Sequence, residues 1–261
     1  MISTLESEIT GVQARIKYPD AKTFKTIVDS LSKILDEAKF ELTSEGLKVV
    51  GMDPAKVALI EVNIPYDSFL EYEILSDEGR VEMGLNMDAL NDMLKRGKKG
   101  DPISFMVSAD KVLLVIESTA IKRYLVHNLE VVLEVPEEVK LEHDVEAVVI
   151  GDVLKKALKD AEVVGDLIEF EADEDKLVLR ARGEGRSRVE TRLTRDTAAL
   201  IDLNVRNPAT SAYDIGYIKN VINLTGVAEA VEIKFSSSKP LELVFKSPDG
   251  SRVRYLLAPS A

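Results

Sequence analysis

Four basic side chains occupy six consecutive positions near the middle of the chain, Lys95, Arg96, Lys98 and Lys99 in the stretch MLKRGKKG. Lysine and arginine bind phosphate groups through charge and hydrogen bonds, without reading a base sequence. The whole chain carries 34 basic and 46 acidic residues, which gives a formal net charge of -12. The cluster therefore predicts one local phosphate-binding face, and the overall charge argues against a protein that coats nucleic acid with its whole surface.

Residues that could support catalysis do not form a recognisable site. The two histidines, His127 and His143, lack Asp or Glu partners at the fixed spacing of a metal site. The stretch GKKGDPIS fails the spacing of a phosphate-binding loop, and GEGRSR lacks the third glycine of a dinucleotide-binding loop. Cysteine is absent, which excludes thiol chemistry and disulfides. We therefore expect no enzyme, no metal and no cofactor; a hydrolase that uses carboxylates is the alternative from another class.

Length and composition limit the architecture. A chain of 261 residues can form one large domain or two of about 130 residues, and 45% apolar residues are ample for a core. No stretch approaches the roughly 18 consecutive apolar residues of a membrane span. The start of the chain, MISTLESEITG, has neither a basic segment nor an apolar run, so we expect no secretory signal. These features predict an intracellular, cytoplasmic protein of a reducing compartment, with no membrane partner.

The elements that would carry the basic residues follow a repeated order. Apolar periodicity and alternation predict a helix, four strands, a helix, a hairpin and a strand in the first half, at 21–37, 39–44, 47–52, 57–64, 80–86, 89–96, 101–118 and 122–129. They predict a helix, a hairpin, two strands, a helix, a hairpin and a strand in the second half, at 151–165, 167–181, 187–194, 198–205, 213–226, 230–247 and 252–261. The repeat favours an α+β fold of two similar domains, each with antiparallel strands backed by two helices. We place these domains at 1–128 and 145–261, joined by an extended acidic connector at 129–144.

Basic residues recur on all four predicted helices, and the full set is Lys22, Lys25, Lys95, Arg96, Lys98, Lys99, Lys155, Lys156, Lys159 and Lys219. Lys22 and Lys25 are three positions apart, and Lys155 and Lys159 are four apart, so each pair shares one helix face. Lysines on a single helix are most often only solvated, but recurrence on four helices favours a common binding surface. The cluster lacks the interleaved aromatic residues on which single-stranded bases stack, so duplex DNA is the expected ligand.

Three further stretches carry a resemblance to a known family. The segments are ILDEAKFELTSEGLKVVGMDPAKVALIEVNIP at 34–65, EVPEE at 134–138 and YLLAP at 255–259. In this order they resemble the DNA sliding clamp, proliferating cell nuclear antigen (PCNA), of the archaeal and eukaryotic type. The resemblance covers about 14–259, and residues 1–12 extend beyond the usual start, where we expect disorder. It implies two DNA-clamp domains per chain and a closed ring of three chains, with helices lining the hole and sheets outside.

The resemblance also implies roles for individual residues. Lys25, Lys95, Lys156 and Lys159 match basic positions that line the hole, and the other basic residues join them on charge alone. Departures occur at Ser32, Asp92 and Asn223, where relatives carry lysine. A pocket for short partner peptides would include Met52, Lys56, Val57, Leu59, Leu133, Val135, Pro136, Pro240, Leu256, Leu257, Ala258 and Pro259. The contact between subunits would include Ile121, Arg123, Tyr124, Leu125, Arg188, Arg192 and Leu193.

The expected function is that of a DNA polymerase processivity factor, a ring that encircles duplex DNA and tethers replication and repair enzymes. The implied partners are DNA polymerase, clamp loader, flap nuclease and DNA ligase, each bound through a short peptide motif. The alternative is a subunit of a mixed-chain, heterotrimeric clamp or of a repair-specialised clamp. The sequence leaves open whether the ring contains identical chains or sister chains.

Overall fold

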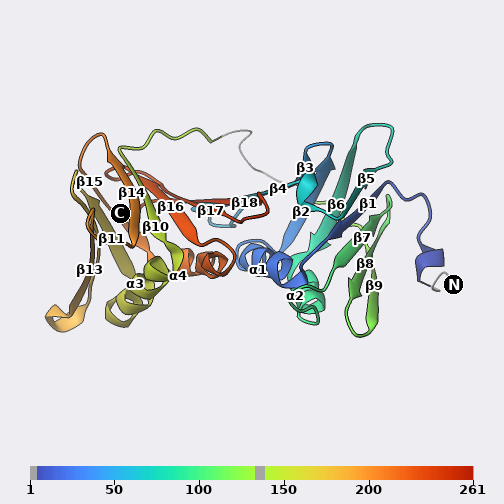
Figure 1. Cartoon of the computed structure of the whole chain (residues 1–261), viewed down its shortest axis with the longest axis horizontal. Helices are drawn as coiled ribbons and strands as arrows, with labels where there is room; N and C mark the ends of the chain where they lie inside the picture. Colours follow the sequence, from blue (N-terminus) through green and yellow to red (C-terminus); the bar gives the residue numbers. More distant parts are fainter. Residues whose placement is uncertain (1–4, 133–138, 261) are drawn as a thin grey trace. The chain divides into compact units, whose positions relative to one another are not determined.

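The computed structural model of the protein describes residues 5–132 and 139–260 (Figure 1). Its internal contacts divide the chain into two compact units. The first comprises Met1–Met52, Glu61–Val135 and Asp249–Ser251, and the second comprises Asp53–Ile60, Pro136–Pro248 and Arg252–Ala261. Each unit has its own helices and antiparallel strands and is described separately below.

The described residues form four α-helices, α1 (Ala21–Ser32), α2 (Met87–Leu94), α3 (Gly151–Val164) and α4 (Ile215–Lys219). They also form short 3-10 turns, η1 (Glu6–Glu8), η2 (Tyr66–Ser68), η3 (Glu184–Arg186) and η4 (Ile222–Gly226). The strands before the connector are β1 (Ala14–Tyr18), β2 (Glu37–Thr43), β3 (Gly46–Met52), β4 (Ala58–Pro65), β5 (Glu71–Ile74), β6 (Arg80–Asn86), β7 (Ile103–Val107), β8 (Lys111–Glu117) and β9 (Ile121–His127). Those after it are β10 (Val145–Ile150), β11 (Leu167–Ala172), β12 (Lys176–Arg182), β13 (Arg188–Thr194), β14 (Leu200–Val205), β15 (Ala209–Asp214), β16 (Ala230–Phe235), β17 (Leu241–Lys246) and β18 (Arg252–Leu257).

The first unit contains a five-stranded antiparallel sheet in the order β5-β1-β7-β8-β9. Beside it, β2 pairs with β3 and with β6 in antiparallel register. The helical spacing of α1 buries Phe24, Ile27 and Leu31, and the Phe24 ring lies 5.6 Å from the ring of Phe105 in β7. Helices α1 and α2 lie side by side (Figure 1). Their apolar faces are therefore used for the core, and their charged faces are left to solvent.

The second unit has the same construction. Five consecutive strands of a larger sheet run antiparallel in the order β14-β10-β16-β17-β18, and a separate four-stranded sheet has the order β13-β12-β11-β15. Helix α3 packs on β12 and β13 and contacts α4. At the centre of the core, the Phe170 ring meets Tyr213 and Phe235 edge-on, at centroid distances of 5.6 and 5.9 Å.

The internal repeat predicted from the sequence is confirmed at the level of elements. The elements from β1 to β9 repeat in the same order from β10 to β18. In this repeat α1 corresponds to α3, and α2 corresponds to α4. The sheet order β5-β1-β7-β8-β9 corresponds to β14-β10-β16-β17-β18, strand for strand. Two antiparallel α+β units with two helices each are the fold class that the sequence predicts.

Several predicted boundaries are wrong, each for a local reason. The first helix ends at Ser32 instead of residue 37, because the N–H groups of Ile34 and Leu35 both turn back to the Leu31 carbonyl, at 3.0 and 2.8 Å. Leu35 then lies over Gly51, where a Cβ atom would come within 2.3 Å of it. The predicted helix at 213–226 is divided into the end of β15, α4 and η4. Helix α4 begins only after Asp214, because the Asp214 carboxylate accepts a hydrogen bond from the Tyr217 N–H and caps the first turn.

Other elements were absent from the prediction. Strands β1, β5 and β10 lie outside all predicted elements, and β15 lies mostly outside them. The expectation of disorder is wrong for residues 5–12, because Ile9 is buried against Leu113 and Val115 of β8. This N-terminal segment, residues 5–12, packs on the five-stranded sheet of the first unit.

Candidate functional site

The basic cluster MLKRGKKG forms the end of α2 and a turn that is held to the start of α1. The Gly100 N–H donates to the Asp20 carboxylate at 2.7 Å, and the same carboxylate caps α1 through the Thr23 N–H at 2.6 Å. Burial alone would raise the pKa of Asp20, but these hydrogen bonds and the nearby charge of Lys99 lower it below its usual value. Ionised Asp20 therefore fixes the basic turn beside the first turn of α1.

The six basic residues predicted in the first unit lie on these two neighbouring segments: Lys22 and Lys25 on α1, and Lys95, Arg96, Lys98 and Lys99 after α2. All of them except Lys25 are exposed, and Lys25 is half-buried. Lys95 donates to Asp92 at 2.6 Å, and this hydrogen bond raises the pKa of Lys95. In the part of the chain that the structure describes, no carboxylate oxygen lies within 4.0 Å of the charged nitrogens of the other five. These five charges are available to an external anion.

The basic surface of the second unit is carried by α3. Lys156 and Lys159 are exposed on this helix and Lys155 is half-buried. Within residues 5–132 and 139–260, no carboxylate oxygen lies within 4.0 Å of their ammonium nitrogens. Lys219, at the end of α4, instead forms an ion pair with Glu162 of α3. The three lysines of α3 are therefore better placed to bind phosphate than Lys219, which is already paired.

The loop before β4 is organised by one buried carboxylate. Asp53 accepts hydrogen bonds from the backbone N–H groups of Ala55, Val57 and Ala58, at 3.1, 2.8 and 2.6 Å. Lys56, at the tip of the loop, adopts a left-handed backbone conformation with φ of 59°. Such a conformation is strained for a residue with a side chain, so it persists only because the surrounding bonds hold it. Asp53 thereby sets the positions of Lys56 and Val57, two residues predicted to bind partner peptides.

The C-terminal tail packs against this loop within the second unit. The Ala258 N–H donates to the Val57 carbonyl at 2.8 Å. The structure places the remaining predicted peptide contacts as follows: Leu59, Leu256 and Leu257 are buried, and Met52, Val57, Pro240, Ala258 and Pro259 are half-buried. The three buried leucines support the loop and tail, whereas the half-buried residues and exposed Lys56 offer surface. Leu133, Val135 and Pro136 lie outside the described residues.

Both described ends of the connector are anchored to their own unit. At its start, the Leu129 N–H donates to the Gly84 carbonyl at 2.9 Å, and a side chain at Gly84 would overlap the Leu129 carbonyl. At its end, the Arg254 guanidinium donates to the Val139 carbonyl at 2.9 Å and also contacts buried Glu242 at 3.0 and 3.1 Å.

Glu242 is the centre of a buried ionic cluster near the end of the connector. Its carboxylate also meets the His143 ring at 3.1 Å. Burial raises the pKa of Glu242, but the hydrogen bonds from His143 and Arg254 outweigh burial and lower that pKa to about 2. Glu242 is therefore ionised at neutral pH, and it holds the segment that contains His143 against β17 and β18.

Among the described residues, three seven-residue strands lie at sheet edges, β6 and β9 in the first unit and β13 in the second. The β6 edge is partly covered, because its Gly84 carbonyl accepts from the Leu129 N–H and its Gly84 N–H donates to the Asn128 side chain. The predicted subunit-contact residues lie on the other two edge strands: Ile121, Arg123, Tyr124 and Leu125 on β9, and Arg188, Arg192 and Leu193 on β13. Ile121 is 57% exposed, whereas Leu193 is only 3% exposed and supports β13 from the core side. The opposite edges of these two sheets leave less backbone available for pairing with another strand. Strand β5 has only four residues, and in β15 the Ala212 carbonyl already accepts from the Ser260 N–H at 2.8 Å.

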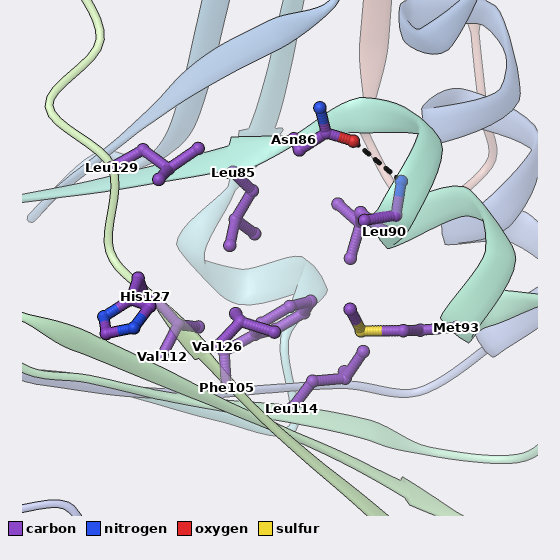
Figure 2. A pocket seen from close by; sticks show the side chains of 11 residues that line it. Leu85, Asn86, Leu90, Met93, Phe105, Val112, Leu114, Val126, His127 and Leu129 are labelled. Carbon is purple, nitrogen blue, oxygen red and sulfur yellow. Dashed lines mark hydrogen bonds between the residues drawn. The ribbon is translucent and has the colours of Figure 1, made fainter.

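A small apolar cavity lies between α2 and the strand β9 (Figure 2). Its volume is about 150 Å³, and its walls include Leu85, Leu90, Met93, Val112 and Val126. His127 lies at its margin, and Asn86 caps α2 above it through the Ala89 N–H at 2.9 Å. The lining holds no cluster of charged groups that would suit catalysis. Among the described residues, no group of three or more His, Asp or Glu side chains could hold a metal ion, and no helix is long and apolar enough to cross a membrane.

Comparisons with known proteins identify the family. A family model described as the N-terminal domain of proliferating cell nuclear antigen matches residues 13–139. The DNA polymerase sliding clamp 1 of Aeropyrum pernix is 55% identical over 241 residues, which cover 92% of this chain and 98% of that protein. This chain belongs to the DNA sliding clamp family. The DNA polymerase sliding clamp of Pyrococcus furiosus is 36% identical over 248 residues, covering 94% of this chain and 97% of that protein.

Solved structures of PCNA proteins share the fold of this clamp chain. PCNA from Thermococcus kodakaraensis superposes with a TM-score of 0.88 at 27% identity, covering 95% of this chain and 100% of that one. A chain of the PCNA2–PCNA3 complex from Sulfolobus tokodaii gives a TM-score of 0.85 at 26% identity, with coverages of 94% and 98%. The resemblance recognised in the sequence is confirmed by these matches.

Three features of this clamp chain escaped the sequence analysis. Asp53 was part of a recognised loop, but its role as the acceptor of three N–H groups was missed, although Asp before Pro is a frequent turn signal. Val132 in the connector is 85% exposed, which makes it a further apolar candidate for partner contact. Glu6 contacts Arg123 of the edge strand at 3.0 Å, and no sequence pattern links two residues so far apart.

Proposed function

We propose that this chain is a DNA polymerase processivity factor that assembles into a ring of three chains around duplex DNA. The observation that carries the proposal is that β9 and β13, each seven residues long, end their sheets and have no strand paired on the outer side among the described residues. An exposed edge presents unsatisfied N–H and C=O groups, and pairing with another chain satisfies them. Because the two edges are different surfaces, their contact is head-to-tail, and such contacts close into rings when the rotation between chains permits.

The helix lysines support a hold on DNA that does not depend on sequence. Eight of the ten basic residues predicted to bind DNA, three of them on α3, have no carboxylate oxygen within 4.0 Å among the described residues. Lysine contacts with phosphate are weak individually and fall steeply with salt, which suits a clamp that must slide. The net charge of -12 over the whole chain further weakens non-specific attraction to DNA.

The loop and tail of the second unit support a docking site for partner peptides. Exposed Lys56 and half-buried Val57, Ala258 and Pro259 lie together there, and apolar anchors of a peptide commonly dominate such contacts. The proposed partners are DNA polymerase, clamp loader, flap nuclease and DNA ligase. In this role the chain acts without catalysis, metal or cofactor, inside the cell and on DNA.

A ring of different chains is the second candidate. It is favoured by the solved PCNA2–PCNA3 complex of Sulfolobus tokodaii and by the numbered name of the Aeropyrum pernix relative. The two candidates differ in whether β9 of this chain accepts β13 of an identical chain or the corresponding strand of a sister chain.

The test is the mass in solution by sedimentation, for the protein alone and mixed with any sister clamps of the same organism. We expect a species of three times the 28.8 kDa of one chain. A trimer of the protein alone supports the identical-chain ring, and a trimer that forms only in the mixture supports the second candidate. A monomer under both conditions would contradict the ring.

A further inference from the structure

The N-terminal segment, residues 5–12, forms a packed cover on one face of the five-stranded sheet. Ile9 is buried with Leu113 and Val115 of β8, and Leu5 and Val12 pack against the same cluster. This face is opposite to the one that lies under α2, because Val112, Leu114 and Val126 line the cavity beneath that helix (Figure 2). The segment therefore covers the face that carries no helix.

Two polar contacts fix the segment beside the edge strand. The Glu6 carboxylate accepts from the Arg123 guanidinium of β9 at 3.0 Å, and the Lys111 ammonium donates to the Glu8 carbonyl at 3.1 Å. Arg123 is opposite Val115 in the sheet and shares its face, so the ion pair lies on the helix-free side. Glu6 thus places a negative charge next to a positive residue of the edge that the proposed ring uses.

The two edge strands have equal lengths, so they can pair along their whole length. One antiparallel register matches all seven residues of β9 with all seven of β13, and it places Ile121 opposite Thr194. In that register Arg123 of one chain lies opposite Arg192 of the next, with about 5 Å between their Cα atoms. Arg192 is exposed and lies on the face of β13 opposite to buried Leu193, which is the helix-free face.

This register brings two positive charges together at the subunit contact. Like charges directly opposite one another destabilise a strand pair. No carboxylate oxygen lies within 4.0 Å of the Arg192 guanidinium among the described residues. The nearby Glu190 is hydrogen-bonded to Arg180 at 2.7 Å, which lowers the pKa of Glu190, and the more distant charge of Arg192 lowers that pKa further. Glu6, already bonded to Arg123, is on the correct face to neutralise the pair.

We propose that the N-terminal segment is a subunit-contact element whose Glu6 bridges Arg123 of its own chain and Arg192 of a second copy. This role rests on the proposed ring, because it requires β9 and β13 of different copies to pair with their helices on the same side. The segment therefore stabilises assembly as well as covering its own sheet. The partner that the segment contacts is a second clamp chain. The two chains would recognise each other through one carboxylate that lies between two guanidinium groups.

The test compares assembly of four proteins by sedimentation across a protein concentration series. Glu6→Arg places a third positive charge at the contact and should raise the dissociation constant of the ring about tenfold or more. Glu6→Arg combined with Arg192→Glu restores opposite charges and should recover assembly to near that of the unmodified protein. Glu174→Arg, an equal charge reversal in the exposed turn between β11 and β12, is the matched control and should assemble normally.

A thermal melt of each variant shows whether the chain is folded, and deletion of residues 1–12 provides a second route that should also weaken assembly. If the unmodified protein forms rings and Glu6→Arg forms them equally well, the bridging role is wrong and the proposed ring stands. If the double variant is as weak as Glu6→Arg alone, Arg192 is not the partner and the role is also overturned. If the unmodified protein never self-assembles, both the identical-chain ring and this role are wrong.

Discussion

Replacement of Asp53 by alanine should destabilise the conformation of the loop that we assign to partner binding. The change removes a charged acceptor from three backbone N–H groups, at 3.1, 2.8 and 2.6 Å. A hydrogen bond to a charged group contributes about 1.5–3 kcal/mol, but the contributions are not additive and water can reach part of this loop. We therefore expect Asp53→Ala to lower the free energy of unfolding by about 3–4 kcal/mol. Asp53→Asn keeps the oxygen that serves Val57 and Ala58, and should cost about 1–2 kcal/mol.

Two assays separate stability from binding. Unfolding in guanidinium chloride, at one fixed protein concentration, gives the change in free energy for each variant. Calorimetry with a peptide from the polymerase tail gives the affinity, which should fall at least tenfold for Asp53→Ala, because Lys56 and Val57 lose their fixed positions. An Asp53→Ala protein whose unfolding free energy and peptide affinity both match those of the unmodified protein would refute this reasoning.

The remaining predictions concern DNA, assembly and pH. Replacing Lys156 and Lys159 with alanine should make the dependence of DNA affinity on salt shallower by about 1–2 in slope, since each phosphate contact contributes about 0.9. Lys246→Ala, which removes a lysine already paired on a strand, is the control and should leave the slope unchanged. Ile121→Asp, at the exposed start of β9, should weaken the ring in sedimentation without lowering the melting temperature of the chain. Folding lowers the pKa of Glu242 from 4.5 to about 2. The ionised carboxylate therefore adds about 3 kcal/mol to the free energy of unfolding above pH 5, and this stabilisation is lost as the pH falls toward 2. Acid titration of unfolding should therefore be flatter for Glu242→Gln, and an equally steep titration would contradict the assignment.

The sequence predicted most of the fold because its strongest patterns are local. The spacing of Phe24, Ile27 and Leu31 specifies a helix with one buried face, and the alternation of β7 and β8 specifies a hairpin. The elements that escaped prediction depend on partners distant in the sequence. Strand β5 alternates only between exposed and half-buried residues, and it exists because β1 pairs with it.

The candidate site was predicted less completely, for the same reason. Helix lysines can be found by counting, but the structure was needed to show that Lys219 is paired with Glu162, whereas Lys156 and Lys159 are not paired among the described residues. The resemblance to clamps located the loop near residue 53 but could not show that one carboxylate holds it. Glu6 and Arg123 are 117 positions apart, so their contact is visible only after folding.

The central claim, that the protein encircles duplex DNA, is tested most directly by topology. Labelled protein is loaded by a clamp loader onto nicked circular DNA, the free protein is removed by gel filtration, and half of the sample is cut once with a restriction enzyme. A ring that encloses the duplex without gripping it should remain on the circle and slide off the cut, linear DNA. Equal retention on circular and linear DNA would show that the protein binds the surface of the duplex, and would contradict the account.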